Sequence, residues 1–101
     1  MSKTAMIGTL TAQDGKADEM EAVLATMVDA ATEEPGTEVY AYFRAPDDTF
    51  HFFAIMTDES SMQGHGQSEA MQAAMQAFMP LMAAPPNMTP ARPVKAIGLD
   101  V

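Results

Sequence analysis

Two neighbouring segments of the chain carry apolar side chains on both of their possible faces. Residues 38–44 and 50–56 are predicted to be strands, joined as an antiparallel hairpin by a short acidic turn that contains Pro46. Successive side chains of a strand point to opposite faces of the sheet. One face of the hairpin would carry Tyr40, Tyr42, Phe50, Phe52, Ala54 and Met56, and the other Val39, Ala41, Phe43, Phe53 and Ile55. A hairpin with one face in water would show polar residues at every second position, so both faces are expected to be covered.

Two further segments show the spacing of amphipathic helices. Within residues 16–33, apolar residues recur every three or four positions, and the Pro-Gly pair at 35–36 would end this helix. A second helix is predicted over about 68–78, with Pro80 ending or kinking it. The predicted core positions are Met20, Val23, Leu24, Met27, Val28 and Ala31 in the first helix and Met71, Ala74, Met75, Phe78 and Met82 in and just after the second.

The remaining segments complete a regular order of elements. Residues 4–12 alternate as a first strand, residues 58–62 look like a short capped helix, and residues 92–99 are predicted to be the last strand. The long elements then follow the order strand, helix, strand, strand, helix, strand. This is the ferredoxin-like βαββαβ plan, an α+β fold in which both long helices cover one face of a four-stranded antiparallel sheet. We expect residues 1–101 to form this single domain.

The uncovered face of that sheet predicts a partner. Four strands of about seven residues present roughly 400 Å² at standard strand spacings. An area of this size is near the largest apolar patch that a soluble monomer usually exposes. The chain is too short to cover both faces with its own helices, so we expect a homodimer in which two sheets pack against each other.

The amino-acid composition excludes several classes of partner and of catalytic group. Fourteen acidic residues against five basic ones give a formal net charge of −9, which repels nucleic-acid phosphates and anionic membranes, so we expect neither partner. The chain has no cysteine, which excludes thiolate nucleophiles and thiolate metal sites. No apolar run approaches the ~20 residues of a transmembrane helix, and the first residues lack the apolar core of a signal peptide. We therefore expect a soluble cytoplasmic protein.

Several short motifs resemble those of the antibiotic biosynthesis monooxygenase family. They are Glu-Pro-Gly-Thr-Glu-Val-Tyr at 34–40, Arg-Ala-Pro-Asp-Asp at 44–48, Phe-Phe-Ala-Ile-Met-Thr-Asp-Glu at 52–59, His65, and the Pro-Pro pair at 85–86. The resemblance implies a dimeric ferredoxin-like α+β barrel with a pocket between helices and sheet in each subunit. The family includes quinol and anthrone-type monooxygenases that need neither metal nor flavin, haem-degrading enzymes, and members without a known substrate. It thus implies a monooxygenase without a bound cofactor that acts on an aromatic quinol or polyketide-like substrate.

The chain also departs from the family pattern. Family members commonly have Trp where this chain has Met56, and a second His or aromatic residue where it has Ala70. Haem-degrading members use an Asn on the first strand, that Trp, and a His on the last helix. This chain has no Trp, no Asn before Asn87 and no His after His65, so haem degradation is disfavoured.

His65 is the candidate catalytic residue. An unperturbed imidazole has a pKa of about 6.5, which suits proton exchange with a phenolic hydroxyl at neutral pH. Gly64 and Gly66 on either side would allow a flat ring to approach closely. In the alternative interpretation, His65 lies at the surface and links two helices without taking part in chemistry.

The candidate substrate contacts lie on the hairpin face that carries the tyrosines. Tyr40 and Tyr42 could donate phenolic hydrogen bonds to a quinone oxygen, and Phe52 and Met56 would form apolar walls. The alternative for all four is ordinary packing between strands. His51 alternates with its aromatic neighbours, so we expect it on the opposite face, as an interface residue.

Three other interpretations arise from the composition and the fold. Eleven methionines suggest a copper(I) site, and Met62 and His65 lie three residues apart, but most methionines fall at predicted core positions, so no metal site is predicted. The same fold could also serve as a non-catalytic dimeric module that binds a small apolar ligand or acts in a stress response. A Met-rich face could also bind a partner protein.

Overall fold

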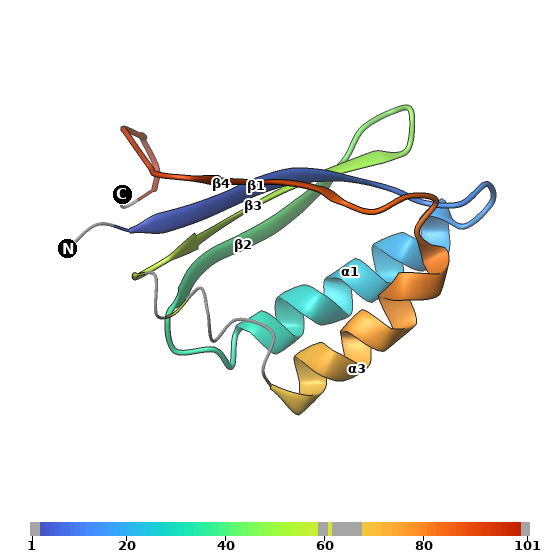
Figure 1. The fold of residues 1–101 in the computed structure, drawn as a ribbon, viewed down its shortest axis with the longest axis horizontal. Coiled ribbons are helices and arrows are strands. Elements are labelled where there is room, and N and C mark those ends of the chain that lie inside the picture. Colours follow the sequence, from blue (N-terminus) through green and yellow to red (C-terminus); the bar gives the residue numbers. More distant parts are fainter. Residues whose placement is uncertain (1–2, 59–60, 62–67, 100–101) are drawn as a thin grey trace.

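The chain folds into one antiparallel sheet with two long helices packed across a single face (Figure 1). The computed structural model describes residues 3–58, 61 and 68–99. The sheet has the strand order β2-β3-β1-β4, and all neighbouring strands are antiparallel. This arrangement confirms the predicted α+β, ferredoxin-like class. The elements are β1 (Thr4–Thr11), α1 (Ala17–Ala31), β2 (Thr37–Arg44), β3 (Thr49–Met56), α3 (Glu69–Phe78), the 3₁₀ helix η1 (Met79–Leu81) and β4 (Asn87–Ala91).

The hairpin of β2 and β3 has the two faces that the alternation predicts. Tyr42 pairs with Phe52 and Tyr40 pairs with Ala54, so these side chains share the face that the helices cover. On the other face, the rings of Phe43 and Phe53 stack with their centroids 6.0 Å apart. The period-2 pattern of the sequence therefore assigned the faces of β2 and β3 correctly.

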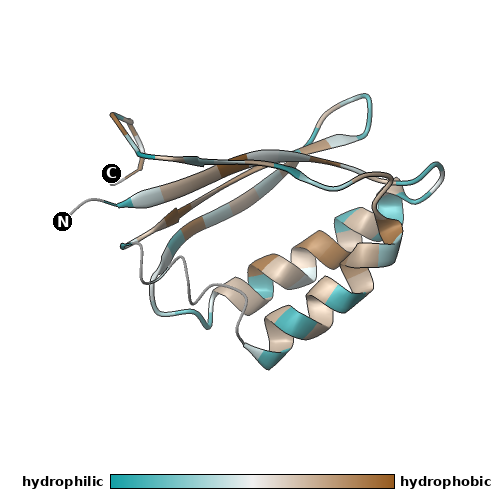
Figure 2. Cartoon of the chain, in the orientation of Figure 1, coloured by the Kyte–Doolittle hydropathy of each residue, from teal (hydrophilic) through white to brown (hydrophobic). Residues whose placement is uncertain are grey.

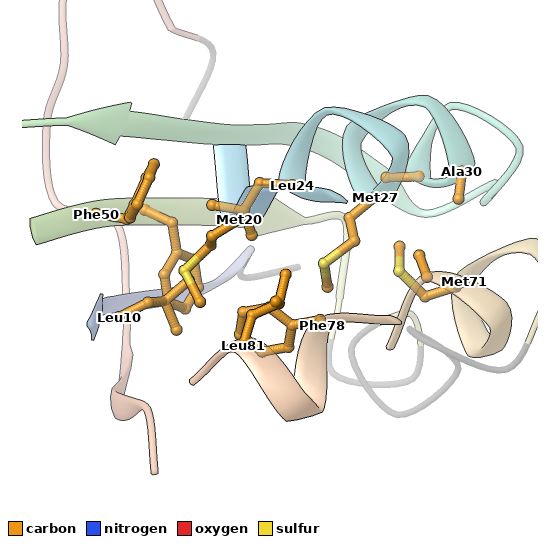
Figure 3. Packing of buried hydrophobic residues seen from close by; sticks show 12 residues of the cluster. Leu10, Met20, Leu24, Met27, Ala30, Phe50, Met71, Phe78 and Leu81 are labelled. Atoms are coloured by element: carbon orange, nitrogen blue, oxygen red, sulfur yellow. The ribbon is translucent and has the colours of Figure 1, made fainter. Parts of the chain in front are cut away.

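The core lies between the sheet and the two helices. Helix α3 begins at Ser68, whose hydroxyl oxygen accepts a 3.1 Å hydrogen bond from the backbone N–H of Met71, a typical N-cap. In α1, Ala30 is buried where the spacing favoured Val28, which is only partly buried. Side chains from both helices and from the sheet point toward a common interior (Figure 3). The labelled members are Leu10, Met20, Leu24, Met27, Ala30, Phe50, Met71, Phe78 and Leu81.

The last strand lies earlier in the chain than predicted. Residues 92–99 form no strand, and β4 ends at Ala91. In the register with β1, Asn87 stands opposite Thr9 and Ala91 opposite Ala5. Because β1 begins at Thr4, residues beyond 91 have almost no strand left to pair with. The prediction for 92–99 followed hydrophobicity, which contains no information about register, and it was wrong.

A single arginine joins the hairpin to the first turns of α1. The Arg44 guanidinium donates to Asp18 at 2.9 Å and Glu21 at 3.0 Å in the helix, and to Asp48 in the hairpin turn at 3.0 Å. Its charge also lies over the buried ring of Phe50, 5.7 Å from the centroid. These carboxylates raise the pKa of Arg44, so it stays charged at any pH at which the protein folds. The contacts fix where α1 crosses the sheet.

The sheet face away from the helices is largely apolar and partly exposed: Ala5 and Ile55 are buried there, whereas other side chains are not. Ile7 is 51% exposed and Phe43 55% exposed on this face, and hydrophobic positions run along the strands in Figure 2. The strands and residues 92–99 together border a hollow of about 570 Å³. Within that last segment, Val94 and Ile97 are also strongly exposed. We call the strand residues Ala5, Ile7, Thr9, Phe43, His51, Phe53, Ile55, Thr89 and Ala91 the outer face.

Gly8 is required because β4 passes close to it. A Cβ atom there would overlap the carbonyl oxygen of Asn87 and lie 2.7 Å from Cε1 of Phe52. We expect Gly8→Ala to lower the free energy of unfolding by about 1–3 kcal/mol, since a strand or a buried ring must move. Urea denaturation monitored by circular dichroism measures this change. An unchanged midpoint would show that β4 can shift without cost.

Candidate ligand-binding site

A cavity of about 320 Å³ lies between the helix-facing side of the sheet and the helices. Its size falls at the lower end of the range for small-molecule pockets. All four strands or their flanking residues contribute to it, and α1 and α3 close it from the other side. The lining residues are Met6, Leu10, Met27, Tyr40, Tyr42, Phe52, Ala54, Met56, Met71, Met75, Phe78, Pro86 and Met88.

Among the described lining residues, the only side-chain oxygens belong to a tyrosine pair. The hydroxyl oxygens of Tyr40 and Tyr42 lie 2.7 Å apart and share a hydrogen bond. Their rings meet edge to face with centroids 5.3 Å apart, and the ring of Tyr42 packs against Phe52 at 5.4 Å. The pair is adjacent because residues two apart in β2 point the same way. It offers a ligand oxygen a hydroxyl group inside an otherwise apolar cavity.

Both phenols stay neutral under ordinary conditions. Burial raises the pKa of Tyr42 far above its usual value, and the neighbouring Tyr40 adds to this effect. Burial also raises the pKa of Tyr40, although its hydrogen bond with Tyr42 opposes the shift. Neither hydroxyl can therefore act as a general base at neutral pH. Within the pair one hydroxyl donates to the other, so at most one of them can donate to a ligand at a time.

These pKa shifts predict sensitivity to alkali. An unfolded tyrosine ionises near pH 10, whereas the folded pair holds its protons at higher pH. The stability from these groups is thus fully present below about pH 10 and is lost as the pH rises above that value. We expect tyrosinate absorbance to appear only together with unfolding. Because the chain has two tyrosines and no tryptophan, absorbance and circular dichroism can be compared without correction for other residues. Tyrosinate forming in the folded protein would contradict the shifts.

The described lining carries no charged side chain. None of its members is Asp, Glu, Lys, Arg or His. Transferring an isolated charge into such a space costs several kcal/mol or more, so a ligand carrying a carboxylate or phosphate would bind poorly. The cavity favours a neutral, flat or elongated apolar molecule with an oxygen at one end.

The structure brings four of the predicted site residues together. Tyr40, Tyr42, Phe52 and Met56 line this one cavity, although their role as substrate contacts stays a prediction. Met56 is fully buried, and its sulfur accepts a 3.3 Å hydrogen bond from the Thr37 hydroxyl. Sequence reasoning assigned the helix methionines to the core alone and missed that several also line the cavity, among them Met27, Met71 and Met75.

Only one of the two histidines, His51, lies within the described residues. His65, the predicted catalytic residue, lies outside the described residues, as do Gly64 and Gly66. Asp58 is described, and its carboxylate caps the backbone N–H of Ser61 at 2.8 Å, as a short capped helix would require. His51 is exposed on the outer face, opposite the cavity. It therefore cannot reach a ligand between the helices and the sheet of its own chain.

The described part of the chain, residues 3–58, 61 and 68–99, shows neither a metal-ligand cluster nor a membrane-spanning helix. No group of three His, Asp or Glu side chains there comes together in a way that could hold a metal ion. None of the helices over residues 3–58, 61 and 68–99 combines the length and apolar character needed to cross a membrane.

Similar solved structures share this fold over nearly the whole chain. A proposed antibiotic biosynthesis monooxygenase of Chloroflexus aurantiacus is 24% identical with a TM-score of 0.85, covering 98% of this chain and 100% of that one. Another from Caulobacter crescentus is 25% identical with a TM-score of 0.84, covering 93% and 92%. A protein of unknown function from Nitrosomonas europaea is 26% identical with a TM-score of 0.84, covering 100% and 98%.

Comparison with curated proteins gives no match. The model of the family described as antibiotic biosynthesis monooxygenase matches residues 4–77, which include α1, the hairpin and most of α3. The motifs at 34–40 and 44–48 and most of the cavity lining fall within that match. The chain therefore belongs to the antibiotic biosynthesis monooxygenase family.

Proposed function

We propose that this protein is a homodimeric monooxygenase that oxidises a neutral aromatic quinol or polyketide-like substrate without a bound cofactor. Family membership supports a monooxygenase-like module in general terms. The observation that carries the narrower proposal is the cavity of about 320 Å³, apolar except for the hydroxyls of Tyr40 and Tyr42. A flat ring system with an oxygen at one end matches both its size and its chemistry.

The proposed reaction needs no electrons from the protein. In an anthrone-type substrate, a methylene group becomes a carbonyl: one atom of O₂ enters the product, and the other leaves as water with the two methylene hydrogens. The substrate thus supplies all the electrons. The protein contributes by removing a proton, holding the electron-rich anion beside O₂ and excluding water.

The roles of the side chains follow from their pKa values and positions. Tyr40 and Tyr42 stay protonated and so cannot serve as bases; one hydroxyl of the pair would donate to the substrate oxygen and stabilise the negative charge that develops there. Phe52 and Met56 would hold the ring. The base must come from another residue, and His65 remains the candidate for this step.

The outer face supports the proposed dimer. It is apolar, it is covered by neither helix, and it includes large exposed side chains such as Ile7 and Phe43. At ~25 cal/mol per Å², covering such a face in two copies contributes a large favourable free energy before the costs of association are subtracted. Packing two outer faces together would also exclude water from behind the central strands that carry the cavity residues.

Oxygen uptake with a panel of hydroquinones and anthrones tests the reaction. We expect wild-type protein to consume O₂ above the background rate with at least one member, and His65→Ala to lower that rate by about 10²–10⁴-fold. His51→Ala is the matched control, since it removes the other histidine, on the opposite face of the sheet. An equal rate in wild type and His65→Ala would remove His65 from the mechanism.

One observation favours a second candidate function. The described lining contains no general base, which is also what a site that only binds would show. In this alternative, the protein is a dimeric module that sequesters a small apolar ligand. Panel members that alter tyrosine emission on binding, yet are never oxidised above background, would favour it over the enzyme.

A further inference from the structure

The methionines of the described lining range from buried to exposed, with Met6 in between. Met56 and Met71 are 0% and 1% exposed, deep in the interior. Met75 of α3 and Met88 of β4 line the same cavity but are 39% and 47% exposed. These two thioethers therefore lie where the cavity meets solvent, on the helix side of the sheet.

Exposed thioethers react with peroxides. The sulfur attacks one peroxide oxygen and forms an S–O bond while the O–O bond breaks, so the thioether is oxidised by two electrons and hydrogen peroxide is reduced to water. The product, a sulfoxide, is polar and chiral, and methionine sulfoxide reductases return it to methionine. Buried thioethers are shielded because the oxidant must reach the sulfur.

We propose that Met75 and Met88 are oxidation sites through which peroxides lower the affinity of the cavity for apolar ligands. A sulfoxide at either position adds a strong hydrogen-bond acceptor to the cavity, where the described residues otherwise contribute only the side-chain oxygens of Tyr40 and Tyr42. The sulfoxide oxygen holds a hydrogen-bonded water molecule, and an apolar ligand that enters past it must displace that water. The switch needs no catalytic turnover and rests on the proposed function only in that the cavity binds an apolar ligand.

A third methionine provides an internal comparison. Met79, in η1, is 59% exposed but does not line the cavity. Its oxidation should therefore be as fast as that of Met75 and Met88 and should leave ligand affinity unchanged. The effect of exposure on the oxidation rate can thus be separated, within one protein, from the effect of oxidation on ligand affinity.

The test combines peptide mass spectrometry with ligand titration after mild treatment with hydrogen peroxide. We expect Met75, Met79 and Met88 to form sulfoxide at least about tenfold faster than Met56 and Met71. The affinity for the neutral fluorophore N-phenyl-1-naphthylamine should fall by about tenfold and recover after incubation with both methionine sulfoxide reductases. Circular dichroism confirms that the treated protein is still folded.

Leucine variants show which oxidised methionines lower the ligand affinity. The double variant Met75→Leu/Met88→Leu keeps the apolar volume but cannot be oxidised, so its affinity should survive the peroxide. Met79→Leu should lose affinity as wild type does. Any of three results would overturn the proposal. Met75 and Met88 could be oxidised no faster than Met71, peroxide could lower the affinity of the double variant, or untreated protein could fail to bind the fluorophore. Oxygen uptake by untreated wild type is a separate measurement, so a failure of the proposed reaction is distinguishable from these outcomes.

Discussion

Replacing Ala54 with leucine is expected to abolish ligand binding while leaving the protein folded. Ala54 lies in β3 opposite Met6 of β1 and Tyr40 of β2, and its side chain points into the cavity. A leucine there occupies the space beside the tyrosine pair that a ring would need. We expect ligand affinity to fall by at least about 100-fold, because a well-packed apolar site cannot hold both groups. Oxygen uptake should fall with it.

Tyrosine emission measures this loss directly. Both tyrosines of the chain lie in the cavity and the chain has no tryptophan, so a bound aromatic ligand changes the emission of residues that touch the site. Ala22→Leu on the exposed side of α1 adds the same side chain elsewhere and should bind as wild type does. If Ala54→Leu binds and oxidises the substrate normally, the reaction takes place outside this cavity and the proposed site is wrong.

Placing acidic residues on the outer face is expected to separate the proposed dimer into folded monomers. Ile7→Glu/Phe43→Glu introduces four carboxylates where two outer faces would meet, in a protein whose net charge is already −9. Burying unpaired carboxylates costs several kcal/mol, so we expect the dimer dissociation constant to rise by at least about 1,000-fold. Analytical ultracentrifugation at micromolar concentration measures the change.

A control with the same charge change isolates the effect of position. Ala22→Glu/Gln76→Glu adds two carboxylates per chain, and so also four per dimer, at exposed helix positions away from the outer face, and should leave the proposed dimer intact. Wild-type protein that sediments as a stable, folded single chain at micromolar concentration would contradict the proposed dimer. The function of the open face would then need another explanation.

Much of this architecture follows from local pattern. Alternation along residues 38–44 and 50–56 assigned Tyr40, Tyr42, Phe52 and Met56 to one face, since a strand offers a side chain only two directions. The spacing of apolar residues and the positions of helix-breaking Pro and Gly residues placed both long helices to within a few residues of their observed bounds. The resemblance of the motifs at 34–40 and 44–48 to a known family was confirmed by the match over residues 4–77.

Other features depend on contacts between segments that lie far apart in the sequence. The position of β4 depends on which residues find a partner along β1, so Asn87–Ala91 pair and the more hydrophobic residues 92–99 do not. The cavity is a gap left by packing, and no local pattern reveals that Met75 and Met88, thirteen positions apart, border the same space. The sequence by itself determined which face of α1, α3, β2 and β3 turns to the interior, because that depends on the period of each element. Only the tertiary structure decided where the interior stays empty, because that depends on the volumes and register of all the elements at once.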